Sequence, residues 1–300
     1  MIWVTWRQHR SQAVAGLAIL CVVALVAIVV GTWMRASFRA DGIPACLARS
    51  GGADCPAAIT SFVHTFDQGV GIIVNLPLVA LPGLFGIVVG APLLGRELER
   101  GTWRLAWSQT VPRTRWLVTK LGLVTGGLVV FGAAVTALMT WLRQPLDQVT
   151  SLLQPGPLFG AEGPALTASL LCAFGLAVLA GLLARNVIVA LVAAYIAWEI
   201  PSTVVVLLNG PIHFPAPATM RIPCGAGSGC AAARVGSVPP VTGHLGDFVL
   251  GITRGGGELI VSYLPASRFW TLQLIDSGLY LAIAVTALGT AVWLLHRRTA

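Results

Sequence analysis

Long apolar stretches constrain this chain more than any other feature of its sequence. A helix needs about 20 apolar residues to cross the hydrocarbon core of a bilayer. Six segments meet that requirement: residues 12–33, 70–95, 117–141, 166–184, 187–208 and 276–295. Because only a helix satisfies its own backbone hydrogen bonds in lipid, each segment is predicted to be helical. The sequence therefore predicts an all-α, polytopic membrane protein, with one transmembrane domain over residues 1–300 and six transmembrane helices.

Composition excludes the soluble classes of protein. Apolar residues make up 56% of the chain and charged residues 10%, and the mean hydropathy is +0.83. A soluble globule could not cover that much apolar surface with polar groups. The first span carries no charge between Ser11 and Met34. It is longer than the roughly 7–15 apolar residues of a signal peptide, so we expect it to remain as an anchor.

Charge distribution predicts which side of the membrane each loop occupies. With a cytoplasmic N-terminus, the cytoplasmic segments hold eleven Arg and Lys residues against two acids, Glu97 and Glu99. The opposite side then holds eight Arg residues and eight acids. Positive residues concentrate on the cytoplasmic side, so both termini are predicted to be cytoplasmic. The net charge of +8 is thus a topology signal that requires no nucleic-acid partner.

Two segments outside the spans have recognisable character. Trp3 and Trp6 lie farther from the first span than Arg7 and Arg10, which favours a short elbow helix lying flat on the membrane. In the large outer loop, residues 209–275, Gly and Pro account for 17 of the 49 residues in 209–257, which argues against regular structure there. Residues 259–270 are predicted to form a re-entrant or interfacial helix, because they are apolar and aromatic but too short to span.

Four cysteines fall in predicted outer loops. Cys46 and Cys55 lie in the first, and Cys224 and Cys230 lie in the last. Two closely spaced pairs outside the membrane suit local disulfides in an oxidising compartment, with free thiols as the alternative. No Cys and His cluster has zinc-site spacing, so no metal site is predicted.

The chain lacks the sequence signals of an energy-converting enzyme. A P-loop requires a Gly-rich loop ending in Lys next to Ser or Thr, and Lys120, the one lysine, has no such loop before it. The chain is therefore predicted not to be an enzyme. Ion-coupled transporters place ionisable residues inside their spans, whereas Glu199 is the one such residue away from the ends of the predicted spans. This counts against a secondary transporter without excluding it.

Residues 96–116, between the second and third spans, hold the densest charge in the chain. Gly101 can end the preceding helix, and Thr102 is a favourable N-cap for a new one. Trp103 and Trp107 are four residues apart and would share a helix face. The segment is predicted either to present a stiff knob to a cytoplasmic partner or to rest its tryptophans on the lipid headgroups.

This segment resembles the cytoplasmic loop of the ABC-2 family of ATP-binding-cassette permeases, six-helix half-exporters driven by a separate ATPase. The matching residues, in order and spacing, are Glu97, Gly101, Thr102, Leu105, Arg113 and Lys120. Thr110 stands where the family usually has Pro, and Pro112 follows two residues later. Residues 263–270, Tyr-Leu-Pro-Ala-Ser-Arg-Phe-Trp, also look like actinobacterial members.

The resemblance implies the transmembrane permease subunit of an ATP-driven ABC exporter in a bacterial cell membrane. Its partner would be an ABC ATPase, with ATP and Mg on that partner and no cofactor in this chain. A homodimer or a pair with a second permease is implied. The residues expected to couple to the ATPase are Glu97, Glu99, Gly101, Thr102, Trp103, Arg104, Leu105, Trp107 and Arg113. A secondary transporter and a non-transporting immunity or assembly protein remain the alternatives.

A substrate path is also predicted, with Asn75, Trp198 and Glu199 as its candidate residues. A charge inside a span is costly, so Glu199 should face protein or water. It would either line the path or sense helix bending. The alternative is a structural role, in which Glu199 is protonated or hydrogen-bonded to a neighbouring helix.

Overall fold

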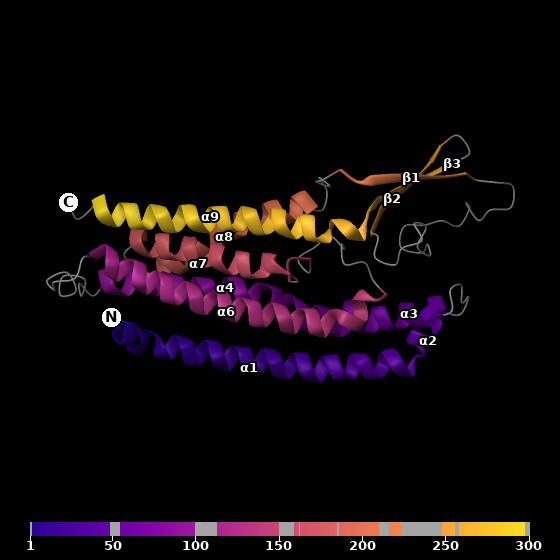
Figure 1. The fold of residues 1–300 in the computed structure, drawn as a ribbon, viewed down its shortest axis with the longest axis horizontal. Coiled ribbons are helices and arrows are strands. Elements are labelled where there is room, and N and C mark those ends of the chain that lie inside the picture. Colours follow the sequence, from indigo (N-terminus) through magenta and orange to yellow (C-terminus); the bar gives the residue numbers. More distant parts are fainter. Residues whose placement is uncertain are drawn as a thin grey trace.

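Long helices form the body of the molecule. The computed structural model describes residues 2–48, 55–99, 113–149, 159–161, 163–184, 186–209, 216–223, 248–255 and 258–297. The long helices within them are α1 (Ile2–Ala40), α4 (Val70–Glu99), α6 (Arg113–Asp147), α7 (Pro164–Ala184), α8 (Val187–Asn209) and α9 (Phe269–Arg297). Figure 1 shows them lying side by side along one axis. Each of these helices covers most or all of one predicted span.

Five of these helices, α1, α6, α7, α8 and α9, are long and apolar enough to cross a membrane. In α4 the apolar part with described side chains is shorter, Ala80–Leu93, within a continuous helix of 30 residues. The helices alternate in direction, so that both termini lie at the same end of the bundle (Figure 1). The fold class is therefore confirmed as an α-helical polytopic membrane protein, and a shared end for the two termini agrees with the predicted topology.

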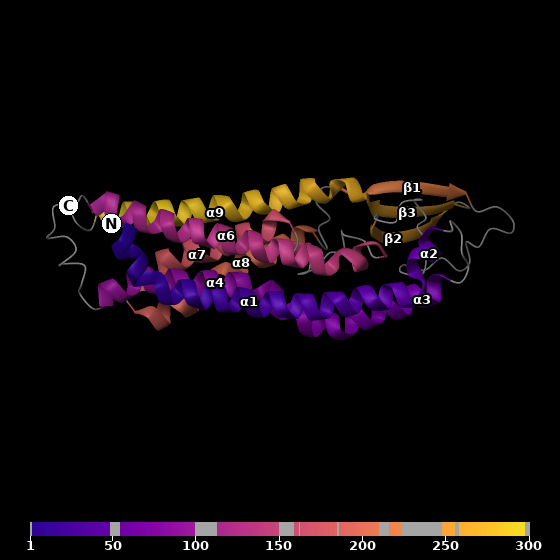
Figure 2. The ribbon, with the colours of Figure 1, turned by 60° about the horizontal axis from the view of Figure 1, so that its bottom comes forward.

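The predicted elbow helix is part of α1. The chain is helical from Ile2 onward, and the first turns bend away from the axis of the rest of the helix (Figure 2). The side chains of residues 2–9, including Trp3 and Trp6, are outside the described part. The contact of these tryptophans with a membrane surface therefore stays a prediction.

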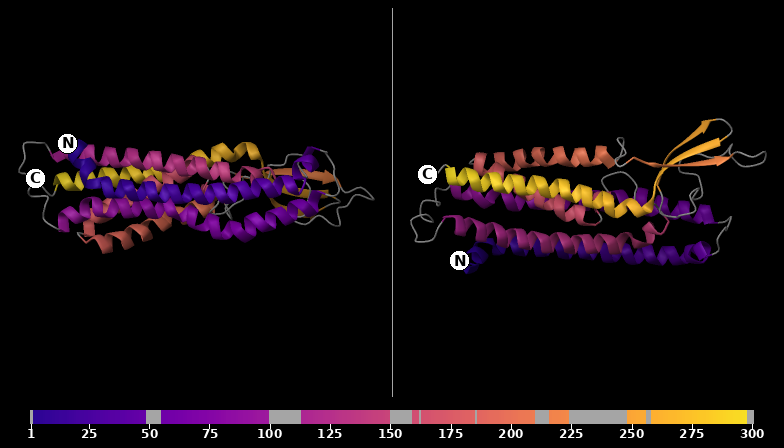
Figure 3. Two further views of the ribbon diagram at one scale, coloured as in Figure 1. Left: turned by 90° about the horizontal axis from the view of Figure 1, so that it is seen from below. Right: turned by 45° about the horizontal axis from the view of Figure 1, so that its top comes forward.

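Helix α7 is the centre of the bundle. It is largely buried and packs most extensively against α4 on one side and α9 on the other, while the helices stay roughly parallel along the bundle (Figure 3). Small residues permit this proximity. A Cβ added at Gly86 would lie 2.6 Å from the Leu170 carbonyl oxygen, and one at Gly90 would lie 2.7 Å from that of Phe174. Gly86 and Gly90, which have the spacing of a GxxxG pair, thus form a close contact between α4 and α7.

The second such pair, Gly122 and Gly126 on α6, behaves differently. A Cβ at either position would meet nothing within 4 Å among the described residues. The same spacing of glycines therefore packs a helix in one case and leaves an open face in the other.

The helices continue beyond the predicted spans at the end opposite the termini. There α1 reaches Ala40 and is followed by α2 (Ile43–Ala48), α3 (Cys55–Val63) and a π-helical turn, η1 (His64–Gly69), that leads into α4. The chain therefore enters α4 through the π turn, and α4 itself is continuous from Val70 to Glu99. These segments share a small core formed by Met34, Phe38, Ile43, Phe62, Phe66 and Leu146.

The large outer loop contains a three-stranded antiparallel sheet. Its strands are β1 (Ala218–Pro223), β2 (Phe248–Gly255) and β3 (Glu258–Leu264), in the order β1-β3-β2. Leu259 and Val261 are buried at alternate positions of β3, as a strand requires. The prediction of an interfacial helix over 259–270 is wrong, because β3 occupies its first half and the long helix α9 already begins at Phe269. The prediction that 209–257 lacks regular structure is also wrong. The sheet projects from the end of the bundle opposite the termini (Figure 1).

Candidate coupling site and membrane cavity

The predicted coupling segment connects α4 to α6 at the end of the bundle that carries the termini. Glu97 and Glu99 lie in the last turn of α4, and Arg113 is the first residue of α6, but the side chains of these three are not described. Gly101, Thr102, Trp103, Arg104, Leu105 and Trp107 lie outside the described residues. The structure therefore fixes the two helix ends that hold this segment, and the helix at 103–109 stays a prediction.

Lys120 fastens these two helix ends together. Its side chain is only 2% exposed, and Nζ donates a hydrogen bond of 2.9 Å to the Leu93 carbonyl oxygen. Leu93 lies near the end of α4, and Lys120 lies two turns into α6. A buried ammonium group is costly unless it is hydrogen-bonded, so this contact holds α4 and α6 in a defined relation. The resemblance placed a lysine at the opening of the third helix, and the structure explains what it contacts.

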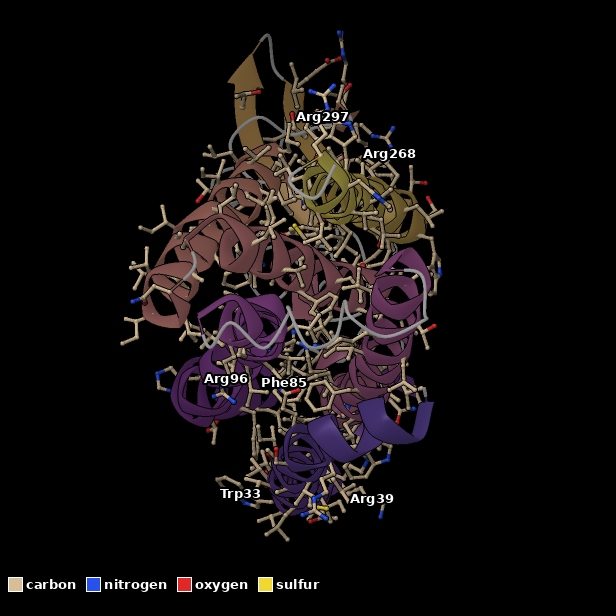
Figure 4. The ribbon with its side chains drawn as sticks, turned by 90° about the vertical axis from the view of Figure 1, so that its left-hand side faces the viewer. Trp33, Arg39, Phe85, Arg96, Arg268 and Arg297 are labelled. Atoms are coloured by element: carbon tan, nitrogen blue, oxygen red, sulfur yellow. The ribbon has the colours of Figure 1, made fainter. Side chains whose placement is uncertain are left out.

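Aromatic packing extends the same connection toward the middle of the bundle. The ring centroids of Phe85 on α4 and Phe131 on α6 lie 4.5 Å apart. Figure 4, which looks along the bundle from the end with the termini, shows Phe85 in its interior, with Arg96 and Arg297 also labelled. Arg96, near the end of α4, is exposed. Together with Gly86 and Gly90, these contacts connect α4 to both α6 and α7.

A cavity of about 410 Å³ lies among α4, α7, α8 and α9, in the half of the bundle nearer the sheet. Two of the predicted path residues, Trp198 and Glu199, line it. Asn75 lies in α4, but its side chain is not described. The polar and aromatic side chains of the wall are Ser169, Trp198, Glu199, Ser202, Thr203, Asn209, Asp276 and Tyr280, together with Phe159.

Asp276 is the most deeply buried acid in this wall, at 1% exposure. Its Oδ2 accepts a hydrogen bond of 2.7 Å from Nδ2 of Asn209, the last residue of α8. Asp276 is the first residue of the last predicted span, and its charge is counted above on the outer side. Helix α9 begins at Phe269, however, two turns earlier, so Asp276 is inside a helix. The expectation that Glu199 is the one ionisable residue away from the ends of the spans is therefore wrong.

Hydrogen bonds join the other polar groups of the wall. The Trp198 indole Nε1 donates to Ser169 Oγ at 3.1 Å, and its ring covers Gly83 of α4, where any Cβ would collide with it. Ser202 Oγ donates to the Trp198 carbonyl oxygen at 2.9 Å, and the Tyr280 hydroxyl lines the same wall. Glu199 is half-buried and lies one turn after Tyr195 on the same helix. Three helices thus contribute polar groups to one internal surface.

Gln273 closes the outer end of this region. It is fully buried, its Oε1 accepts from the Ala165 backbone N–H at 3.2 Å, and its Nε2 donates to the Phe159 carbonyl oxygen at 2.9 Å. Ala165 lies in the first turn of α7, where backbone N–H groups lack intrahelical partners. Gly163, just before it, has φ of +70° and leaves no room for a Cβ beside Gln273. Sequence reasoning missed this residue, since a lone Gln before an apolar run carries no local signal.

The candidate disulfides are partly accounted for. Cys46, on α2, is disulfide-bonded. The side chain of Cys55, at the start of α3, is not described, and Cys224 and Cys230 lie outside the described residues. Among the residues that the structure describes, no three His, Cys, Asp or Glu side chains are grouped so as to hold a metal ion.

The sequence matches one protein family over most of the helical bundle. The family described as ABC-2 membrane transporter related matches residues 17–208, which covers α1 through α8 almost to its end. The chain belongs to this family. Neither a curated protein nor a solved structure matches it.

Membership of the ABC-2-related family gives the architecture a general function. The protein is a multi-pass membrane permease of the ABC-transporter type, and a bacterial cell membrane is consistent with this family. Members of the family generally pair with an ABC ATPase subunit, and the permease domain itself is not catalytic. The matched region includes α4, α6 and the segment between them.

Proposed function

We propose that this chain is the permease subunit of an ATP-driven exporter, in which a separate ATPase grips the segment between α4 and α6. Nucleotide-driven movement of the ATPase would pass through that segment into the bundle. Two copies of the chain, or this chain and a second permease, would pair with two ATPase subunits. ATP and Mg would be bound by the ATPase.

The observation that carries the proposal is the buried contact between Lys120 Nζ and the Leu93 carbonyl oxygen. A mechanical signal requires stiff elements that move together. This contact ties the two helices that leave the segment, and Gly86 and Gly90 then press α4 against the central helix α7. A force applied between Glu99 and Arg113 would therefore reach the interior rather than bend one helix alone.

The proposed anchors are Trp103 and Trp107, because buried aromatic side chains dominate the energetics of protein interfaces. The test is a double substitution, Trp103→Ala with Trp107→Ala, in the permease reconstituted with its ATPase in nanodiscs. The ATPase should retain its basal hydrolysis, lose most of its stimulation by the permease and co-purify less well. The readouts are the rate of ATP hydrolysis and the amount of ATPase retained on the tagged permease.

Trp293→Ala provides the matched control. Trp293 lies near the same end of the bundle, is 49% exposed and stacks against Arg297 with 4.2 Å from the guanidinium to the ring. It lies on α9, outside the proposed contact, so its loss should leave stimulation unchanged. Unchanged stimulation in the double variant would contradict the proposal. Transport that needs no nucleotide and stops when an ion gradient collapses would establish a secondary transporter instead.

A further inference from the structure

We propose that the cavity among α4, α7, α8 and α9 binds organic cations, with Asp276 and Glu199 as the groups that attract the positive charge. The site would take an ammonium group attached to an apolar or aromatic body. That the bound cation is the exported substrate rests on the proposed function. Binding itself does not, because the cavity belongs to this chain alone.

The described wall of the cavity carries acidic side chains and no basic ones. Asp276 and Glu199 come from different helices, α9 and α8, and both line the space. Among the described residues of the wall, none is Lys, Arg or His. The hydrogen-bond donor to Asp276 is the neutral Asn209 amide. Charges in a low-dielectric recess attract counter-ions strongly, so this wall favours a cation and opposes an anion.

Aromatic side chains form part of the cavity wall. Trp198, Tyr280 and Phe159 line the same cavity. Aromatic rings attract cations through their negatively charged faces, and quaternary ammonium groups are recognised in this way. The same rings provide apolar surface for the body of such a ligand. Inorganic cations would gain little here, since they require several oxygen ligands in close coordination.

The cavity is large enough to hold a small organic ligand. At about 410 Å³ it falls within the range of roughly 300–1,000 Å³ that ligand pockets occupy. Its polar groups are also held in place. Trp198 Nε1 donates to Ser169, Ser202 donates to the Trp198 carbonyl oxygen, and Asn209 donates to Asp276. A pre-formed wall of this kind reduces the entropy lost when a ligand binds.

Intramembrane carboxyl groups are costly, and those that proteins keep usually have a role in binding or transport. Asp276→Asn would keep an oxygen that accepts the hydrogen bond from Asn209, and it would remove the charge. The contact with α8 therefore does not require the negative charge of the carboxyl group.

The experiment measures binding to the permease alone, in nanodiscs without any ATPase. The probe is benzyltrimethylammonium, and the matched probe is phenylmethanesulfonate, an anion of similar size with the same aromatic ring. Binding to each is followed by calorimetry, with empty nanodiscs as the background. The cation should bind saturably, and the anion should show no binding above the background.

Asp276→Asn and Glu199→Gln remove one charge each while keeping the shape of the side chain. Each should weaken binding of the cation roughly tenfold or more, as loss of one partner of a desolvated charge pair does. Asp41→Asn, which removes an exposed acid beyond the end of α1, should change nothing. If Asp276→Asn fails to fold, the half-buried Glu199 carries the test by itself.

Equal binding of the two probes would overturn the inference. Wild-type affinity for the cation in Glu199→Gln would also overturn it, provided that Asp276→Asn, if it folds, shows wild-type affinity as well. Such results would leave the proposed coupling to an ATPase untouched, because that is measured by the stimulation of ATP hydrolysis. Conversely, a permease that binds the cation but never stimulates an ATPase would retain the site and lose the exporter function.

Discussion

At the scale of single residues, Lys120 is the most informative side chain at the end of the bundle that carries the termini. Lys120→Met keeps the length of the side chain and removes the ammonium group, so the hydrogen bond to the Leu93 carbonyl oxygen is lost. We expect the variant to unfold more easily, by about 1–3 kcal/mol, since a buried acceptor loses its partner. Stimulation of the ATPase should fall with it. Thermal unfolding in nanodiscs and the ATPase rate provide the two measurements.

Arg96→Met is the control for this change. Arg96 lies at the same end, on α4, but it is exposed, so losing its charge should shift stability by less than about 0.5 kcal/mol. If Lys120→Met and Arg96→Met behaved alike, the buried contact would not be what couples α4 to α6.

Residue roles in the interior were only partly predictable. Glu199 and Trp198 were singled out because a charge and an indole stand out in an apolar span, and both line the cavity. Asp276 was misplaced because hydropathy marks where a span is apolar, while the helix itself begins at Phe269. Gln273 was missed because its partners, Phe159 and Ala165, are more than 100 residues away in the sequence.

At the scale of helices, the two glycine pairs make opposite predictions from the same spacing. Alanine raises helix propensity by up to about 1 kcal/mol at any of the four positions. At Gly86 and Gly90, however, the new Cβ would meet backbone oxygens of α7 within 2.7 Å. We expect Gly86→Ala with Gly90→Ala to destabilise the fold by about 1–3 kcal/mol, as overpacking does. Gly122→Ala with Gly126→Ala should be neutral or stabilising.

Thermal unfolding of the two double variants in nanodiscs checks this prediction. The comparison is internal, because all four sites are helical glycines changed to the same residue. A loss of stability at Gly122 and Gly126 equal to that at Gly86 and Gly90 would mean that the contact between α4 and α7 is not what distinguishes them.

Elements were predictable in proportion to how local their signal is. The helices were found because about twenty apolar residues in a row leave few alternatives. The extension of α1 to Ala40 was not, since it depends on a small core with Phe62 and Leu146 from distant segments. The sheet was missed because Gly and Pro dominated the composition of the loop. The run Gly255-Gly256-Gly257 between two β-branched segments is nevertheless a hairpin signal.

At the scale of the whole molecule, the alternation of the helices places the sheet at one end and both termini at the other (Figure 1). The charge distribution predicts that the termini are cytoplasmic. With that orientation the sheet and the disulfide-bonded Cys46 would lie outside, where oxidising conditions favour disulfides. Sequence and structure thus contribute different halves of the topology. The charge distribution predicts which side of the membrane each end of the bundle occupies, and the fold shows which elements lie at the same end.

Single cysteines at two exposed positions test this topology. Arg221→Cys lies on β1 and Arg297→Cys at the end of α9. A maleimide that cannot cross membranes should label Arg221→Cys in intact cells and label Arg297→Cys only after permeabilisation, because the bilayer separates the two ends. The wild-type chain, measured alongside, gives the background from native cysteines. The reverse pattern would place the segment between α4 and α6 outside the cell, where no ATPase could grip it, and the exporter proposal would fail with it.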